Sequence, residues 1–247
     1  MPENRIGFFT DVGASYVLPR LPGEIGTYMS LTGARLTGAD AVQAGLATHL
    51  VPVDRLGEIP DLIARALLHR APWGAVDGLL DRLAIARDAA TIRQQQPEID
   101  RCFGHDTVEE VLVALQTEDS DWSRHAAGVL AQQCPTSLKV TLKAMRRGAR
   151  ASFGRCMAME YGICQTLIAR PDFAEGVRAQ LVDKCRQPAW QPATLAEVSD
   201  EVVARCFARR RAVHPEPREG LHAGAGIPTE IGTATAVRTE APLPETA

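Results

Sequence analysis

Aromatic residues, paired cysteine motifs and long apolar runs are scarce or absent in this 247-residue chain. Aromatics make up 5% of the residues, which argues against the stacking platforms on which proteins bind single-stranded nucleic acid. The net charge of −3 lacks the basic excess that is typical of nucleic-acid binders. No run of apolar residues approaches the ~20 that a membrane-spanning helix needs. We therefore expect no nucleic-acid partner and no membrane partner.

The 6 cysteines are scattered and never form a CxxC pair. Structural zinc sites usually draw their ligands from such closely spaced pairs, so no metal is expected. The chain is too long, and its cysteines too irregular, for a disulfide scaffold, which favours reduced thiols. The opening PENR is not the basic run leading into an apolar core that marks a secretory signal. The sequence therefore predicts a soluble, cytoplasmic protein.

The pattern of apolar residues predicts an α/β chain in which short strands come early and helices follow. Apolar runs at 6–9 and 47–51 have strand character, and short helices are expected between them at 14–18, 24–31 and from Thr37 onward. At the last of these, Thr37 is a suitable N-cap because a threonine side chain can accept a hydrogen bond from the first turn.

Beyond residue 54 the pattern is almost wholly helical. Thr107 and Ser120 are expected to cap helices, and Pro135 fits the first turn of another. A further long helix is expected to carry an apolar face, whose members recur at helical spacing. They are Phe153, Met157, Tyr161, Cys164 and Ile168.

Three regions are expected along the chain. Residues 1–53 would hold the strands and the candidate site, and residues 54–208 a helical part. Residues 209–247 are rich in Ala, Gly, Pro, Thr and Glu. Such a segment buries too little apolar surface to offset its ordering entropy, so it is predicted to be disordered.

The best candidates for chemistry are two carboxylates near the start, Glu3 and Asp11. Two carboxylates in different surroundings can be tuned apart, one acting as base or nucleophile and the other as positioner. Gly13 follows at a predicted helix start, where its N–H can meet an anionic or polarised oxygen. Spacing alone leaves the commoner alternatives open: a helix cap or solvated group for each carboxylate, and a tight turn for Gly13.

Two other polar positions are expected to be structural. Glu160 and Tyr161 on the long helix are interpreted as a buried polar pair. His49, on a candidate strand, is interpreted as a packed or surface histidine rather than a catalyst.

The motifs themselves carry a resemblance to a known family. MPE-x-x-IGFF-x-DVG-x-SY-x-LPRLPG resembles the segment that marks 3-hydroxyisobutyryl-CoA hydrolases, a branch of the enoyl-CoA hydratase/isomerase (crotonase) superfamily. The similarity extends to about residue 203. It runs through LTGARLTGADAVQAGLATHLV, IDRCFGHDTVEEVLVAL, CPTSLKVTLKAMRRG, MAMEYGI and DFAEGVRAQLVDKCRQPAWQPATLAEV.

The resemblance implies a spiral of ββα units followed by a helical C-terminal part, acting on an acyl-CoA thioester. Glu3 is similar to the family's catalytic glutamate, which would attack the thioester carbonyl or activate a water. Asp11 resembles the aspartate that would orient the substrate's 3-hydroxyl or assist proton movement. Glu3, Asp11 and Gly13 are thus the expected substrate-binding residues. Coenzyme A is part of the substrate, so no separate cofactor is implied, and a homo-oligomer is possible.

This chain departs from the family most clearly by lacking any Gly-Gly dipeptide. The family builds part of its oxyanion hole from a GGG-type segment upstream of Met-Pro-Glu, so the chain resembles a truncated, C-terminal portion. Ala14 and Cys185 are smaller departures, standing where glycine and aspartate are usual.

Three functions remain open at this point. The first is a 3-hydroxyisobutyryl-CoA hydrolase of valine degradation, impaired if the chain is truncated. The second is an enoyl-CoA hydratase or isomerase, which Asp11 disfavours because those relatives usually carry a small residue there. The third is an inactive fragment that acts only as an interaction partner.

Overall fold

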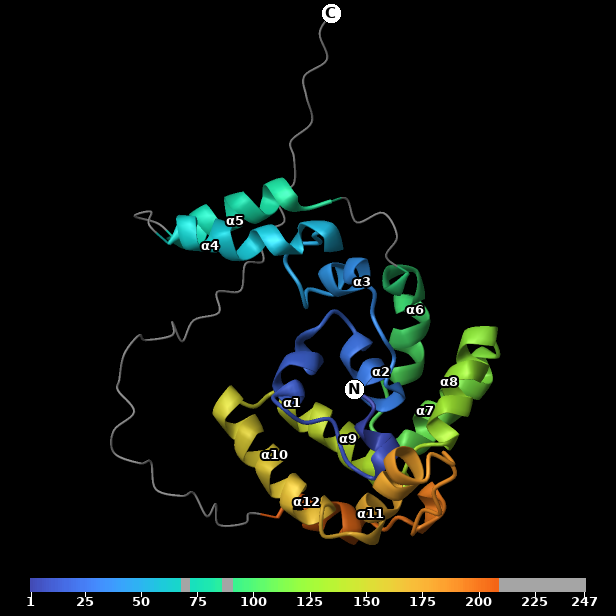
Figure 1. The fold of residues 1–247 in the computed structure, drawn as a ribbon. Coiled ribbons are helices and arrows are strands. Elements are labelled where there is room, and N and C mark those ends of the chain that lie inside the picture. Colours follow the sequence, from blue (N-terminus) through green and yellow to red (C-terminus); the bar gives the residue numbers. More distant parts are fainter. Residues whose placement is uncertain (68–71, 86–90, 209–247) are drawn as a thin grey trace, which may run out of the picture. The chain divides into compact units, whose positions relative to one another are not determined.

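The computed structural model describes residues 1–67, 72–85 and 91–208. Within these ranges the regular structure is entirely helical (Figure 1). The α-helices are α1 (Ala14–Val17), α2 (Ile25–Thr32), α3 (Gly38–Gln43), α4 (Ile59–Ala66), α5 (Pro72–Leu83), α6 (Ile92–Phe103), α7 (Val108–Glu118), α8 (Asp121–Ala131), α9 (Pro135–Gly148), α10 (Phe153–Leu167), α11 (Pro171–Val177) and α12 (Asp200–Cys206). Single 3₁₀ turns cover Glu3–Ile6, Leu18–Arg20, Val53–Glu58 and Leu195–Glu197, and a π-helical turn covers Arg178–Val182.

The strands expected at 6–9 and 47–51 are not formed, so the predicted ββα remnant is not confirmed. The first run ends a 3₁₀ turn and continues without regular structure, and the second has no regular structure. A strand is held by the ladder it makes with a neighbour, and none of the described residues supplies one. Phe8 and Phe9 are nevertheless buried. Phe8 packs on Phe173 of α11, with ring centroids 5.5 Å apart.

The predicted helix starts are largely confirmed. Thr37 accepts a hydrogen bond from the Asp40 amide, and the Asp40 carboxylate accepts one in return from the Thr37 amide. Thr107 caps α7 in the same way, and Ser120 caps α8. Pro135 is the first residue of α9, where its missing N–H costs nothing. These starts were predictable because each cap involves residues only three positions apart.

Helix α9 is the most deeply buried long helix around the site. It contacts α1, α2, α7, α10 and α12. Arg146 on α9 binds across this packing, donating to the Glu24 carboxylate at 2.8 Å and to the carbonyl oxygens of Phe103 and His105, each at 2.7 Å. One guanidinium thus joins α9 to the residue before α2 and to the end of α6.

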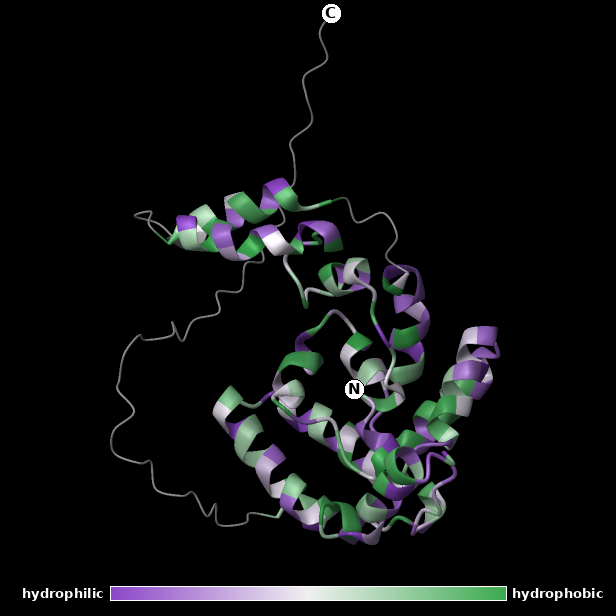
Figure 2. Cartoon of the chain, viewed as in Figure 1, coloured by the Kyte–Doolittle hydropathy of each residue, from purple (hydrophilic) through white to green (hydrophobic). Residues whose placement is uncertain are grey.

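Helix α10 carries apolar residues on two faces (Figure 2). One face, with Cys156, Ile163 and Leu167, is fully buried. The other is the face predicted from the sequence, and most of it is exposed: Phe153 is 54%, Tyr161 42% and Ile168 50% accessible.

No helix among the described residues is both long enough and apolar enough to cross a membrane. The predicted boundary between residues 53 and 54 remains a prediction. The segment 209–247, predicted to be disordered, lies outside the described residues.

Two glycines on helices test how closely α1 and α9 pack. A Cβ at Gly148 of α9 would lie 1.8 Å from the Ser15 carbonyl oxygen, whereas a Cβ at Gly128 of α8 would meet nothing within 4 Å. We predict that Gly148→Ala lowers the free energy of unfolding by about 1–3 kcal/mol through overpacking. Gly128→Ala should raise it by about 0.5–1 kcal/mol, because alanine favours the helix. Urea unfolding measures both, and equal stabilisation by the two variants would contradict the close contact.

Candidate active site

Glu3 is held in place by its neighbour Asn4. Asn4 is 1% exposed, and its side-chain amide donates to the Ser30 carbonyl oxygen of α2 at 2.8 Å. Its Oδ1 accepts from the Thr141 hydroxyl of α9 at 2.8 Å, and its backbone oxygen accepts from the Cys134 amide at 3.1 Å. The 3₁₀ turn that carries Glu3 is therefore bound to two helices that come later in the chain.

Asp11 opens a tight turn with an unusual backbone. The Ala14 amide donates to the Asp11 carbonyl oxygen at 3.1 Å, and the two central residues, Val12 and Gly13, have φ values of 57° and 84°. Positive φ at both central positions is typical of a type I′ turn, which Asn-Gly adopts easily. Valine resists it because its Cβ is branched, at a cost of about 1–3 kcal/mol. Surrounding contacts must hold this turn.

Glu160 of α10 supplies those contacts. Its Oε2 accepts from the Gly13 amide at 2.8 Å, and its Oε1 accepts from the Ser15 amide at 3.0 Å and from the Ser15 hydroxyl at 2.5 Å. The Glu160 side chain is nearly fully buried, at 3% exposure. A buried carboxylate needs such donors, because an unpaired one would lose its hydration without compensation.

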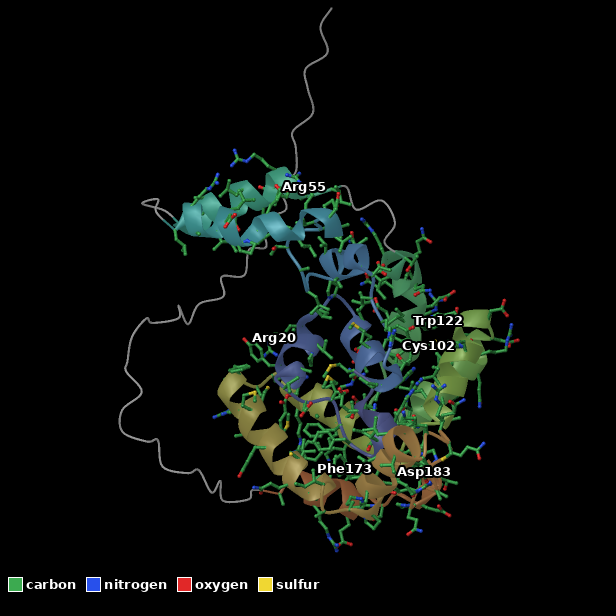
Figure 3. The ribbon with its side chains drawn as sticks, in the orientation of Figure 1. Arg20, Arg55, Cys102, Trp122, Phe173 and Asp183 are labelled. Carbon is green, nitrogen blue, oxygen red and sulfur yellow. The ribbon has the colours of Figure 1, made fainter. Side chains whose placement is uncertain are left out.

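Arg20 holds helix α1, which follows this turn (Figure 3). Its guanidinium donates to the carbonyl oxygens of Gly148 and Ala151, at 3.1 and 2.8 Å, and stacks over the Tyr16 ring at 3.7 Å. Tyr16 in turn meets Phe153 edge-on, with ring centroids 5.6 Å apart. The short helix α1 is thus fixed against the end of α9 and the start of α10.

The two predicted carboxylates influence one another. Burial raises the pKa of Glu3, and the nearby charge of Asp11 adds to that rise. Burial also raises the pKa of Asp11, and the charge of Glu160 adds to it. The Glu3 Oε2 atom is buried and has no hydrogen-bond partner in the described part of the chain. One oxygen of Glu3 is therefore left to receive a proton, a water or a substrate atom.

Gly13 meets an anion, as its position suggested, but the anion belongs to the protein. Its amide donates to Glu160, and contact between Gly13 and a substrate stays a prediction. The Glu160–Tyr161 pair is only half as expected, since Glu160 is buried while Tyr161 is 42% exposed. His49 bonds Thr48 at 2.8 Å and Asp81 at 3.1 Å, as a packed or surface histidine does.

The role of Glu160 was not predicted from the sequence. Its partners lie 145 and 147 residues away, so no local spacing reveals them. A signal was present nevertheless: Glu160 falls at helical spacing among Cys156, Ile163 and Leu167, on the buried face of α10. A single acid in an apolar stripe indicates a carboxylate with dedicated donors.

No cluster of three potential metal-binding side chains occurs within residues 1–67, 72–85 and 91–208. That Glu3 and Asp11 carry acid–base chemistry stays a prediction.

Comparison with curated proteins gives consistent relatives. The chain is 39% identical to "3-hydroxyisobutyryl-CoA hydrolase, mitochondrial" of Danio rerio and to the protein of the same name of Homo sapiens. These matches cover 84% and 81% of this chain, and 55% and 53% of the relatives. "3-hydroxyisobutyryl-CoA hydrolase 1" of Arabidopsis thaliana is 38% identical over 85% of this chain and 57% of its own length. The chain therefore spans about half the length of the curated relatives it matches.

These relatives contradict the predicted cytoplasmic location. The vertebrate proteins are named as mitochondrial, so that prediction is wrong. Free thiols and a near-neutral charge balance suit both compartments, which is why composition could not separate them.

Solved structures and a family model complete the comparison. A carnitinyl-CoA dehydratase of Mycobacterium thermoresistibile superposes with a TM-score of 0.76 at 38% identity, over 86% of this chain and 59% of that one. An enoyl-CoA hydratase of Rhodobacter sphaeroides 2.4.1 gives 0.69 at 34% identity, over 84% and 58%. The family model described as enoyl-CoA hydratase/isomerase matches residues 1–207. The chain, with its Met-Pro-Glu carboxylate and Asp-Val-Gly turn, belongs to the enoyl-CoA hydratase/isomerase family.

Proposed function

We propose that Glu3 and Asp11 are the catalytic carboxylates of an acyl-CoA thioester hydrolase whose substrate is 3-hydroxyisobutyryl-CoA, in valine degradation. The observation that carries the proposal is the buried, unpartnered Oε2 of Glu3, in a carboxylate near enough to Asp11 for that charge to help raise its pKa. The names of the curated relatives supply the substrate.

In this mechanism the reaction begins at Glu3. As a general base, its carboxylate takes a proton from water, whose oxygen attacks the thioester carbonyl carbon. As a nucleophile, it attacks that carbon itself and water then cleaves the resulting anhydride. In both routes the C–S bond breaks, and the thiolate of coenzyme A leaves and takes up a proton. A raised pKa makes the ionised Glu3 carboxylate a stronger base than an ordinary glutamate.

Asp11 is proposed to bind the 3-hydroxyl group of the acyl chain and to assist proton movement. Its pKa, raised by burial and by the charge of Glu160, makes it a ready hydrogen-bond acceptor and proton carrier. A hydroxyl donor on the substrate satisfies Asp11 where a plain acyl chain does not, which favours a 3-hydroxylated substrate.

Hydration or dehydration of an enoyl-CoA is the second candidate. It is favoured by the two structural neighbours, which are named as a dehydratase and a hydratase. The two reactions differ in product, because hydrolysis releases free coenzyme A and hydration consumes the enoyl double bond. A thiol assay and the absorbance of the enoyl thioester therefore separate them, and free thiol without loss of the double bond supports the hydrolase.

Thioester hydrolysis forms an oxyanion whether Glu3 acts as a base or as a nucleophile, and this oxyanion needs hydrogen-bond donors. Loss of one such donor lowers the rate by roughly 10²–10³-fold. We expect little turnover from these 247 residues by themselves. Joined behind the part of a curated relative that precedes the matched region, where the family resemblance implies a glycine-rich segment, they should release coenzyme A. Fast release by the chain alone would contradict the need for that segment.

Glu3→Gln in the extended protein should lower kcat by roughly 10²–10⁴-fold, because the amide can neither accept a proton nor attack the carbonyl. Glu201→Gln makes the same chemical change on the exposed helix α12, where Glu201 bonds Arg205 at 2.5 Å, and it should leave the rate unchanged. The assay follows free thiol from 3-hydroxyisobutyryl-CoA. An undiminished rate in Glu3→Gln would remove Glu3 from the mechanism.

The rate should also depend on pH in one direction. Glu3 works as the ionised carboxylate, and its pKa is raised, so activity should fall as the pH drops through a value above the ordinary glutamate pKa of about 4.3. The acid limb of kcat/KM against pH reports this value. A limb at or below the ordinary value would show that Glu3 is not the titrating group.

A further inference from the structure

Glu160 has no part in the proposed chemistry, yet it is the most completely engaged carboxylate near the site. Its two oxygens accept three hydrogen bonds, from the Gly13 amide, the Ser15 amide and the Ser15 hydroxyl, at 2.8, 3.0 and 2.5 Å. It is the one acid within α10. All three donors belong to the segment that directly follows Asp11.

We propose that Glu160 is the positioning residue of this site: its buried carboxylate holds the Asp11–Ala14 turn in its left-handed form and so fixes the position of Asp11 relative to Glu3. That Asp11 and Glu3 form a catalytic site rests on the proposed function, whereas the hydrogen bonds to Glu160 do not depend on it. It assigns to Glu160 no contact with substrate.

The backbone conformation shows why this turn needs support from other residues. Val12 has a φ of 57° and is 78% exposed, so packing of its own side chain does not hold it there. A valine in this region returns to negative φ unless its neighbours are fixed. Glu160 fixes the amides of Gly13 and Ser15, which lie on either side of Ala14 and close after Val12.

A carboxylate is required, not merely a polar side chain. Each of its oxygens accepts and neither donates, which suits three donors. Glutamine places an NH₂ group where one oxygen now stands, so a donor would face the Gly13 amide or the Ser15 pair. The structural fit is therefore specific to the anion.

Glu160 also has an electrostatic effect on Asp11. The ionisable groups that act on Asp11 or are acted on by it are Glu160 and Cys164 from α10 and Glu3 from the opening 3₁₀ turn. After burial, the charge of Glu160 contributes most to raising the Asp11 pKa. Removing that charge should lower the Asp11 pKa. Loosening the turn would also reduce the burial of Asp11, which raises this pKa, and its backbone hydrogen bond, which lowers it.

The test compares Glu160→Gln with Glu201→Gln, the same change at the exposed position on α12. In Glu160→Gln, NMR titration should show the Asp11 carboxyl with a lower pKa than in the wild-type chain. Exchange of the Gly13 and Ser15 amide hydrogens should become roughly tenfold faster or more, since each loses a charge-assisted bond. In the extended protein kcat should fall by roughly 10²-fold with a smaller change in KM, as displaced catalytic groups cause. Glu201→Gln should change none of these quantities.

An unchanged Asp11 pKa with unchanged amide exchange in Glu160→Gln overturns the proposal. Normal kcat in that variant overturns it too, while leaving the hydrolase assignment intact. If the Asp11 pKa and the amide exchange of Gly13 and Ser15 change as expected but the wild-type extended protein releases no coenzyme A, the positioning role of Glu160 is supported and the proposed function fails.

Ser15→Ala provides a second variant that keeps the buried charge. It removes the 2.5 Å hydroxyl bond and leaves both amide donors, so a folded chain is expected. Amide exchange at Gly13 should be faster than in the wild-type chain but slower than in Glu160→Gln. Exchange at the wild-type rate in Ser15→Ala overturns the proposal even when Glu160→Gln does not fold.

Discussion

The constraint on which this site depends is the burial of the Glu160 carboxylate between α10 and the turn that follows Asp11. A charge at 3% exposure is tolerated only with enough donors around it, and here the donors are the Gly13 amide and the amide and hydroxyl of Ser15. The same bonds that make the charge tolerable hold Val12 and Gly13 at positive φ. The requirement of Glu160 for donors and the requirement of the turn for support are met by one set of contacts.

Asn4 does for Glu3 what Glu160 does for the Asp11 turn. Its amide and backbone oxygen bind α2 and the residue before α9, and its Oδ1 accepts from α9 itself. In both cases a buried polar side chain fixes a short irregular segment by bonding atoms far away in sequence. The two proposed catalytic carboxylates therefore stand on short segments outside the long helices. Asn4 holds the segment that carries Glu3, and Glu160 holds the one that carries Asp11. This arrangement places acids accurately where regular structure is lacking.

The sequence predicted local features well and distant ones poorly. The caps at Thr37, Thr107 and Ser120 were predictable, because each bonds a residue three positions away. The strands at 6–9 and 47–51 were not formed, since a strand depends on a partner that apolar runs do not identify. The motif led to Glu3 and Asp11, but not to Glu160, whose bonds span more than 140 residues. The resemblance supplied what spacing alone left open, and composition misled on location.

Glu160, Asp11 and Glu3 differ in the hydrogen bonds and charges that surround them. Glu160 accepts three hydrogen bonds from the segment that follows Asp11. Asp11 is half-buried, and its partial burial and the charge of Glu160 raise its pKa. Glu3 is also half-buried, with its Oε2 atom buried and unpartnered, and its pKa is raised as well. Burial and a neighbouring acid of the same sign therefore favour the protonated forms of Glu3 and Asp11 more than in free side chains. In the proposed hydrolysis Glu160 is the fixed acceptor that supports the turn, and Glu3 and Asp11 are the acids proposed to exchange protons with water and substrate.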